Sequence, residues 1–158
     1  MPKQKVTMKK IVIFLVLVIL AGVVYYFGLH SYFLKTEIME DLPFSGGTAM
    51  EPKIIATGSF GAIDLFHKGS GQAKLINLEG KKILRLENFN VTSGPDLFVY
   101  LSDSKQPTRD IKDLGEYVDL GILKATSGNQ NYDVPSSAAS YRTAVIWCKQ
   151  FGVRFSFA

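Results

Sequence analysis

The sequence places its only cysteine, Cys148, directly after its only tryptophan, Trp147. A cysteine thiolate can act as a nucleophile, a redox group or a metal ligand, and its reactivity depends on a lowered pKa. Lys149 follows, but neighbouring residues of a strand point to opposite faces of the sheet, so this cation is poorly placed to activate the thiol. Cysteine is also among the most buried residue types. The residues alone therefore leave two interpretations of Cys148 open: a reactive or ligating thiol, or a small apolar side chain in a core.

His67 is the second candidate ligand, and the only other histidine, His30, lies at the end of an N-terminal apolar segment. Together with Cys148, His67 would supply the ligand types of a haem or copper site. The two residues form no sequence motif, however, and His67 stands beside a glycine-rich turn expected over residues 67–71, where a solvated histidine is the more common arrangement. A single cysteine also excludes an intrachain disulfide and a C-x-x-C site built by this chain alone.

The sequence gives little support for other catalytic chemistry. The chain has no G-x-S-x-G, H-E-x-x-H, Walker or G-x-G-x-x-G pattern and no carboxylate pair at a spacing that indicates a glycosidase. We expect Asp96, in Gly-Pro-Asp, to form a turn. If the strand is regular, Trp147 and Cys148 face opposite sides, so that one lines the core and the other an outer surface, and we expect the tryptophan in the core.

An uncharged apolar run over residues 11–29 predicts a transmembrane helix, since a helix of this length spans about 28 Å. Four lysines lie within residues 1–10, so the positive-inside rule predicts a cytoplasmic N-terminus and an extracytoplasmic remainder. A cleaved signal peptide is the alternative, but its apolar region is usually shorter and ends in small residues, whereas bulky residues 23–27 follow Ala21 and Gly22 here. We therefore predict an uncleaved signal-anchor and a single-pass protein of the cell membrane.

The remainder reads as a linker over residues 30–52 and one β domain over residues 53–158. Eight short β-favouring segments separated by turn residues predict an all-β fold, either an antiparallel β-sandwich or a small barrel. The segments are residues 53–60, 73–78, 83–89, 97–102, 117–123, 131–134, 141–149 and 152–158. The net charge of +4 comes largely from the N-terminal lysines, so nucleic-acid binding is not expected.

Several segments, taken in order, resemble the DM13 domain family over about residues 53–158. They are Gly58 to Phe60 with His67 to Gly71, Leu84 to Phe89, Gly94 to Ser102, Tyr117 to Gly121, Gly128 to Pro135, Val145 to Cys148, and Phe151 to Ala158. Singly these segments are weak signals, but their order and spacing are specific to the family.

The resemblance implies an exported β-rich module of a kind often found beside DOMON-type domains, which bind haem or sugar. It further implies electron transfer through the cysteine that matches Cys148, acting as a thiol or as the ligand of a prosthetic group such as haem, with a redox partner protein. The sequence also leaves open a non-catalytic module for adhesion or for binding an extracellular ligand, in which Cys148 is a buried structural residue and loops such as residues 103–113 form the binding face.

Overall fold

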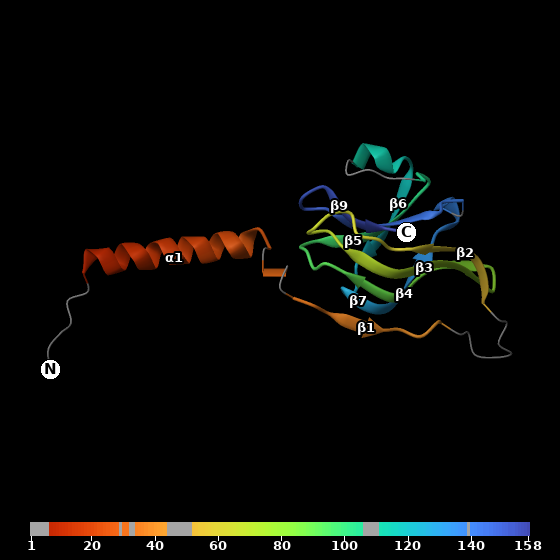
Figure 1. Ribbon diagram of the computed structural model, residues 1–158, viewed down its shortest axis with the longest axis horizontal. Coiled ribbons are helices and arrows are strands. Elements are labelled where there is room, and N and C mark those ends of the chain that lie inside the picture. The colour runs from red at the N-terminus through yellow and green to blue at the C-terminus, as the bar shows by residue number, and fades with distance from the viewer. Residues whose placement is uncertain (1–6, 29, 32–33, 44–51, 106–110, 139) are drawn as a thin grey trace.

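The computed structural model describes residues 7–28, 30–31, 34–43, 52–105, 111–138 and 140–158. Helix α1 (Met8–Tyr26) extends away from the rest of the molecule, and none of its residues is buried (Figure 1). It is long and apolar enough to cross a membrane. The helix begins three residues before the predicted span, since Lys9 and Lys10 continue its first turn, and it ends at Tyr26.

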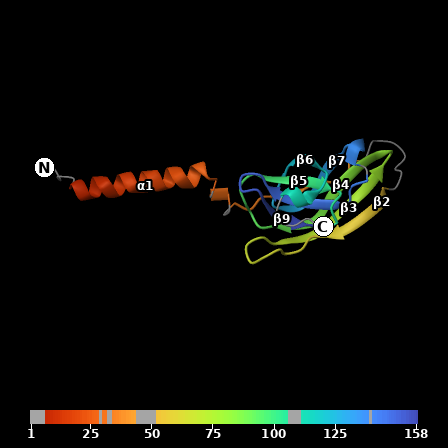
Figure 2. The ribbon, with the colours of Figure 1, turned by 90° about the horizontal axis from the view of Figure 1, so that it is seen from above.

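Two sheets stack as a sandwich, and the described strands do not close into a barrel (Figures 1 and 2). The first sheet has the order β1 (Glu37–Met39), β7 (Ser127–Val134), β4 (Lys81–Val91), β3 (Gly69–Leu78) and β2 (Lys53–Ser59). The second has the order β6 (Tyr117–Ile122), β5 (Leu97–Ser102), β8 (Thr143–Cys148) and β9 (Val153–Phe157). The pairings are antiparallel except that of β1 with β7, which is parallel. The predicted all-β sandwich is thus confirmed.

The strand boundaries follow from local sequence. Glu79 and Gly80 link β3 to β4 with φ values of 52° and 85°, the backbone of a tight hairpin turn, for which glycine is well suited. Two short 3₁₀ helices, η2 (Ile111–Leu114) and η3 (Ser136–Ala138), interrupt the strands. The glycine-rich turn expected over residues 67–71 is wrong in part, because β3 already begins at Gly69.

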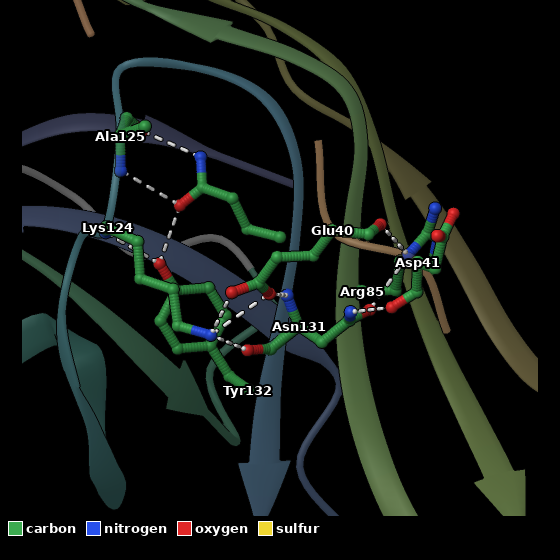
Figure 3. A network of polar contacts seen from close by, with 8 residues as sticks. Glu40, Asp41, Arg85, Lys124, Ala125, Asn131 and Tyr132 are labelled. Atoms are coloured by element: carbon green, nitrogen blue, oxygen red, sulfur yellow. Dashed lines mark hydrogen bonds and ion pairs between the residues drawn. The ribbon is translucent and has the colours of Figure 1, made fainter. Parts of the chain in front are cut away.

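The linker predicted over residues 30–52 contains a strand of the first sheet. β1 pairs with β7, and a polar network then holds the backbone that follows it (Figure 3). Arg85 donates from Nη1 to the carbonyl oxygen of Glu40 at 3.1 Å, and Asn131 donates from Nδ2 to that of Asp41 at 2.7 Å. The Lys124 ammonium lies 2.8 Å from Oε1 of Glu40. This segment is therefore part of the folded sheet.

The main core lies between the two sheets. It is formed by alternate residues of the strands, including Leu86, Val99, Ile146 and Cys148. A smaller apolar cluster of Tyr100, Leu114, Val145 and Trp147 lies on the other face of the second sheet. These two clusters divide the apolar side chains of β8 between them.

Candidate functional site

Cys148 is the last residue of β8 and is completely buried. Its position opposite Leu97 of β5 brings it beside the loop that precedes that strand. The Sγ atom lies 3.0 Å from the carbonyl oxygen of Pro95, to which the thiol donates a hydrogen bond. The sulfur thus lies inside the intersheet core, at the end of the second sheet where β8 turns into β9.

Two opposing effects act on the Cys148 thiol. Burial raises its pKa above the usual value because the thiolate would lose its hydration, and the nearby charge of Asp96 adds to this effect. The backbone N–H groups of Phe151 and Gln150 point at the sulfur and act in the opposite direction. Burial prevails, so at neutral pH the group is a protonated thiol that already has amide donors directed at it.

The loop before β5 closes over this sulfur. Asp96 has a φ of 55°, which fits the turn predicted for Gly-Pro-Asp, and its carbonyl accepts the backbone N–H of Lys149 at 3.1 Å. Gly94 leaves room for the Phe155 ring, because a Cβ at position 94 would lie 2.5 Å from Cζ of that ring. The Cys148 end of the domain is therefore tightly packed.

Trp147 lies on the opposite face from Cys148, as predicted from strand alternation. It is 1% exposed, yet it belongs to the smaller cluster and not to the intersheet core. The expectation of a tryptophan in the main core is therefore wrong, and η2 contributes Leu114 to the cluster that buries the ring. The side chain that lines the core is Cys148.

A row of stacked rings begins at Trp147 and crosses the second sheet. Tyr100 of β5 stacks on Trp147 with 6.3 Å between ring centroids and 20° between ring planes. Tyr117 of β6 stacks on Tyr100 at 4.9 Å and 21°. Trp147 and Tyr100 are buried, whereas Tyr117 is 41% exposed. The row thus connects the residue next to Cys148 with the protein surface.

Lys149 points away from the thiol, as strand alternation predicts. Its ammonium lies 2.7 Å from a carboxylate oxygen of Asp119 and 3.6 Å from the centroid of the Phe98 ring. These partners hold the cation on the same face of the sheet as Trp147. The thiol of Cys148 therefore receives no activation from its neighbour in sequence.

His67 has other partners than Cys148. Its Nδ1 lies 2.8 Å from Oδ2 of Asp64, and its ring packs edge-on against Phe155 at 4.6 Å between centroids. The side-chain hydrogen bond from His67 holds the pKa of Asp64 well below its usual range, and the backbone N–H of His67 adds to this effect. His67 is therefore part of a loop structure, and none of the interactions described here joins it to the sulfur.

A comparison of the chain with models of protein families identifies its family. The family model described as "Electron transfer DM13" matches residues 60–158. The chain belongs to the DM13 electron-transfer family. No curated protein and no solved structure matches the chain. The DM13 match contains both Cys148 and the row from Trp147 to Tyr117.

A haem or metal bound by this DM13 domain alone does not fit the described residues. Cys148 is enclosed in the core, and His67 is engaged with Asp64. Within the described part of the chain, no group of three or more His, Cys, Asp or Glu side chains is arranged to hold a metal ion.

The contribution of Tyr100 and Tyr117 was missed by sequence reasoning. Both residues stand in segments predicted as strands. Tyr100 meets Trp147 only through the pairing of β5 with β8, and Tyr117 meets Tyr100 only through the pairing of β5 with β6. Burial raises the pKa of Tyr100, and the charge of Asp119 adds to this effect, so its phenol stays protonated. The adjacent Trp and Cys were the only signal in the sequence that pointed to this row.

Proposed function

We propose that this chain is an exported, membrane-anchored electron-transfer module of the DM13 family, with Cys148 as its redox group. The observation that carries the proposal is the stacked row of rings from Trp147, the residue before Cys148, to the exposed Tyr117. Cysteine, tryptophan and tyrosine are the side chains that lose single electrons most readily. The row therefore supplies a path from the residue that precedes the thiol to the surface.

The proposed reaction is a one-electron oxidation of the thiol. A partner protein that carries a one-electron oxidant strong enough to oxidise a phenol takes an electron from Tyr117, whose phenolic proton passes to water. The resulting radical takes an electron from Trp147 and regains a proton. Trp147 in turn takes an electron from Cys148, and the S–H bond breaks; because the thiol is buried and its pKa is raised, release of this proton to solvent is the costly part of the path. In sum, one thiol and one oxidised partner become one thiyl radical, one proton and one reduced partner, and a one-electron donor reverses the reaction.

In this path the electron passes between Trp147 and Tyr117 across the Tyr100 ring, and Tyr100 itself is not oxidised to a radical. Its raised pKa disfavours loss of the phenolic proton, and oxidation of a tyrosine is favourable only when that proton can leave. Tyr117 is exposed and can exchange its proton with water. The surface around Tyr117 is therefore the proposed contact for the redox partner.

The proposed anchor is α1. The helix has the length and apolar character of a membrane span, and its residues are exposed, whereas the core helix of a soluble domain would be covered by its neighbours. The lysines at its N-terminal end favour an N-terminus in the cytoplasm and a β domain outside the cell membrane. A cleaved signal peptide would export the same domain without the anchor.

Flash oxidation of the full chain tests the redox path. A photoexcited ruthenium complex, too large to enter the core, would oxidise surface side chains, and mass spectrometry would measure oxidation products of Cys148. We expect oxidised Cys148 in the native chain and about a tenfold loss in Tyr117→Phe, because phenylalanine cannot donate the electron. Tyr141→Phe, which alters a tyrosine outside the row, is the matched control. Equal oxidation of Cys148 in the native chain and in Tyr117→Phe would exclude the path.

A second candidate function is a binding or adhesion module with a structural cysteine. The complete burial of Cys148 and its raised pKa favour this alternative, as does an open cavity of about 620 Å³ whose lining includes Glu40, Lys124, Tyr132 and Asp133. The binding loop predicted over residues 103–113 lies partly outside the described residues, at 106–110. Absence of Cys148 oxidation in the native chain under the flash experiment would favour this function.

A further inference from the structure

The loop between β2 and β3 carries the two most exposed large apolar side chains of the described β domain. Leu65 is 81% exposed and Phe66 is 77% exposed. The loop is firmly built, because Oδ1 of Asp64 accepts the backbone N–H groups of Phe66 at 2.8 Å and His67 at 2.7 Å. The backbone N–H of Ile63 also donates to the carbonyl of His67 at 2.9 Å. The two apolar side chains are thus presented outward by an ordered turn.

This loop is fixed to the end of the sandwich that contains Cys148. Lys68 and Thr92 exchange two hydrogen bonds, one from the Lys68 backbone N–H to Oγ1 of Thr92 at 3.1 Å and one from the Thr92 N–H to the Lys68 carbonyl at 2.9 Å. Thr92 begins the same loop whose Pro95 carbonyl accepts the thiol of Cys148. The apolar tip and the sulfur therefore belong to one end of the domain.

The same end of the domain meets the end of α1. Gln150, in the turn between β8 and β9, donates from Nε2 to the carbonyl oxygen of Phe27 at 3.0 Å, one residue after α1 ends. A Cβ at Gly28 would lie 3.0 Å from Cβ of Pro95. In both ribbon views the loop after β2 and the β8–β9 turn form the edge of the domain nearest to α1 (Figures 1 and 2).

We propose that Leu65 and Phe66 insert into the surface of the bilayer that α1 crosses. This inference rests on the membrane anchoring given under the proposed function. Apolar side chains presented at the level where a membrane helix ends are stabilised by leaving water for the headgroup boundary. Phe151, 42% exposed in the β8–β9 turn, lies on the same end, and the exposed Lys68 suits anionic headgroups. Because α1 keeps the domain at the bilayer, this small apolar contact is sufficient.

Such docking would orient the whole domain. With the loop and the α1 junction both at the membrane, the Cys148 end faces the bilayer and is shielded from soluble oxidants. The far end of the sandwich, where β2 begins, then faces away from the membrane, since β2 runs toward the docked loop. The domain would be held in one orientation and would not turn freely on its tether.

Fluorescence quenching by brominated lipid tests the docking in the full chain. Phe66→Trp places a reporter in the loop, and the chain is reconstituted into phosphatidylcholine and phosphatidylglycerol vesicles whose acyl chains carry bromine. We expect a blue-shifted emission from the new tryptophan and loss of most of its intensity, relative to vesicles without bromine. The native chain supplies the background, because its only tryptophan, Trp147, is 1% exposed. Ile54→Trp is the matched control, since Ile54 is 54% exposed at the far end of β2 and should not be quenched.

Three further variants separate docking from anchoring and test the role of Leu65. Tyr25→Trp reports whether α1 itself is in the bilayer. Quenching of Tyr25→Trp without quenching of Phe66→Trp would overturn the docking and leave the anchor intact, whereas no quenching of Tyr25→Trp would overturn both. Adding Leu65→Ser to Phe66→Trp should weaken the quenching, and adding Ile54→Ser should not. The measurement needs no redox reaction, so its outcome is independent of the role proposed for Cys148.

Discussion

The thiol of Cys148 lies 3.0 Å from the carbonyl oxygen of Pro95 and joins the end of β8 to the loop before β5. Both partners lie at the packed end of the sandwich, where the cysteine is completely buried. A carbonyl acceptor favours the protonated form of the thiol, because a thiolate has no proton to donate. The contact therefore favours the neutral, protonated thiol over the thiolate.

Alkylation of Cys148 should be slow in the folded chain and fast after unfolding. Burial raises the thiol pKa, so its midpoint in the folded state should lie above about 8.5, the value of an unperturbed cysteine. Because the folded state keeps this proton longer than the unfolded state, stability should fall as pH rises from the unfolded pKa through the higher folded one. Rates of iodoacetamide labelling against pH, with and without urea, measure both the raised pKa of the thiol and the loss of stability at high pH. Rapid labelling of the folded chain at neutral pH would contradict this description of the site.

Gly94→Ala should destabilise the domain by about 1–3 kcal/mol, the usual range for an overpacked core. Its new Cβ would lie 2.5 Å from Cζ of Phe155, and that ring is completely buried and has little room to move. Urea unfolding of the full chain in detergent, followed by the fluorescence of Trp147, measures the loss. Gly61→Ala is the matched control, because a Cβ there meets nothing within 4 Å. Equal midpoints for the two variants would show that the Phe155 packing is looser than described.

Sequence periodicity predicted most of this fold. Strands such as β5 and β9 have β-favouring residues between clear turn signals, so their existence follows from local chemistry. β1 was not predicted, because a strand of three residues shows no measurable periodicity. Its position depends on pairing with β7, which lies about ninety residues later in the sequence. Strand pairing over such a distance leaves no mark in the local sequence.

The site was harder to predict for the same reason. Alternation places Trp147 and Cys148 on opposite faces, but both faces of β8 are apolar, so the pattern does not say which of them lines the core. That choice depends on η2, whose Leu114 covers the outer cluster. The stacking of Tyr100 on Trp147 depends on the register of β5 against β8, which only the folded sheet determines.

Glu87→Gln should destabilise the domain at neutral pH and have less effect in acid. The hydrogen bonds from Lys74 and then Arg85 hold the pKa of Glu87 below its usual value. A carboxyl whose folded pKa is lowered contributes its full stability above the unfolded pKa, near 4.5, and loses it as pH falls through the folded value. Urea midpoints at pH 7 and pH 3 measure the difference. An exposed residue of the β3–β4 turn, Glu79, provides the control Glu79→Gln; a Glu87→Gln deficit that persists unchanged at pH 3 would contradict the assignment.

Lys124→Met should release the segment after β1 from the first sheet. Burial alone would raise the pKa of Glu40, but the hydrogen bonds from Lys124 and the Asn131 backbone and the charges of Lys124 and Arg85 outweigh it, so the pKa is lowered. Lys124 also donates to the Asn131 carbonyl at 2.8 Å, which makes it the link between this segment and β7. Its removal leaves the segment held by the three-residue parallel pairing of β1 and by the hydrogen bonds of Arg85 and Asn131 to the backbone after it.

Hydrogen exchange of the full chain measures that release. In Lys124→Met we expect faster exchange over residues 37–41 and unchanged protection of β3 and β4, because the two central strands keep their own antiparallel pairing. Lys53→Met, which alters an exposed lysine at the start of β2, is the matched control. Unchanged exchange over residues 37–41 would mean that the pairing with β7 and the contacts of Arg85 and Asn131 suffice to hold this segment.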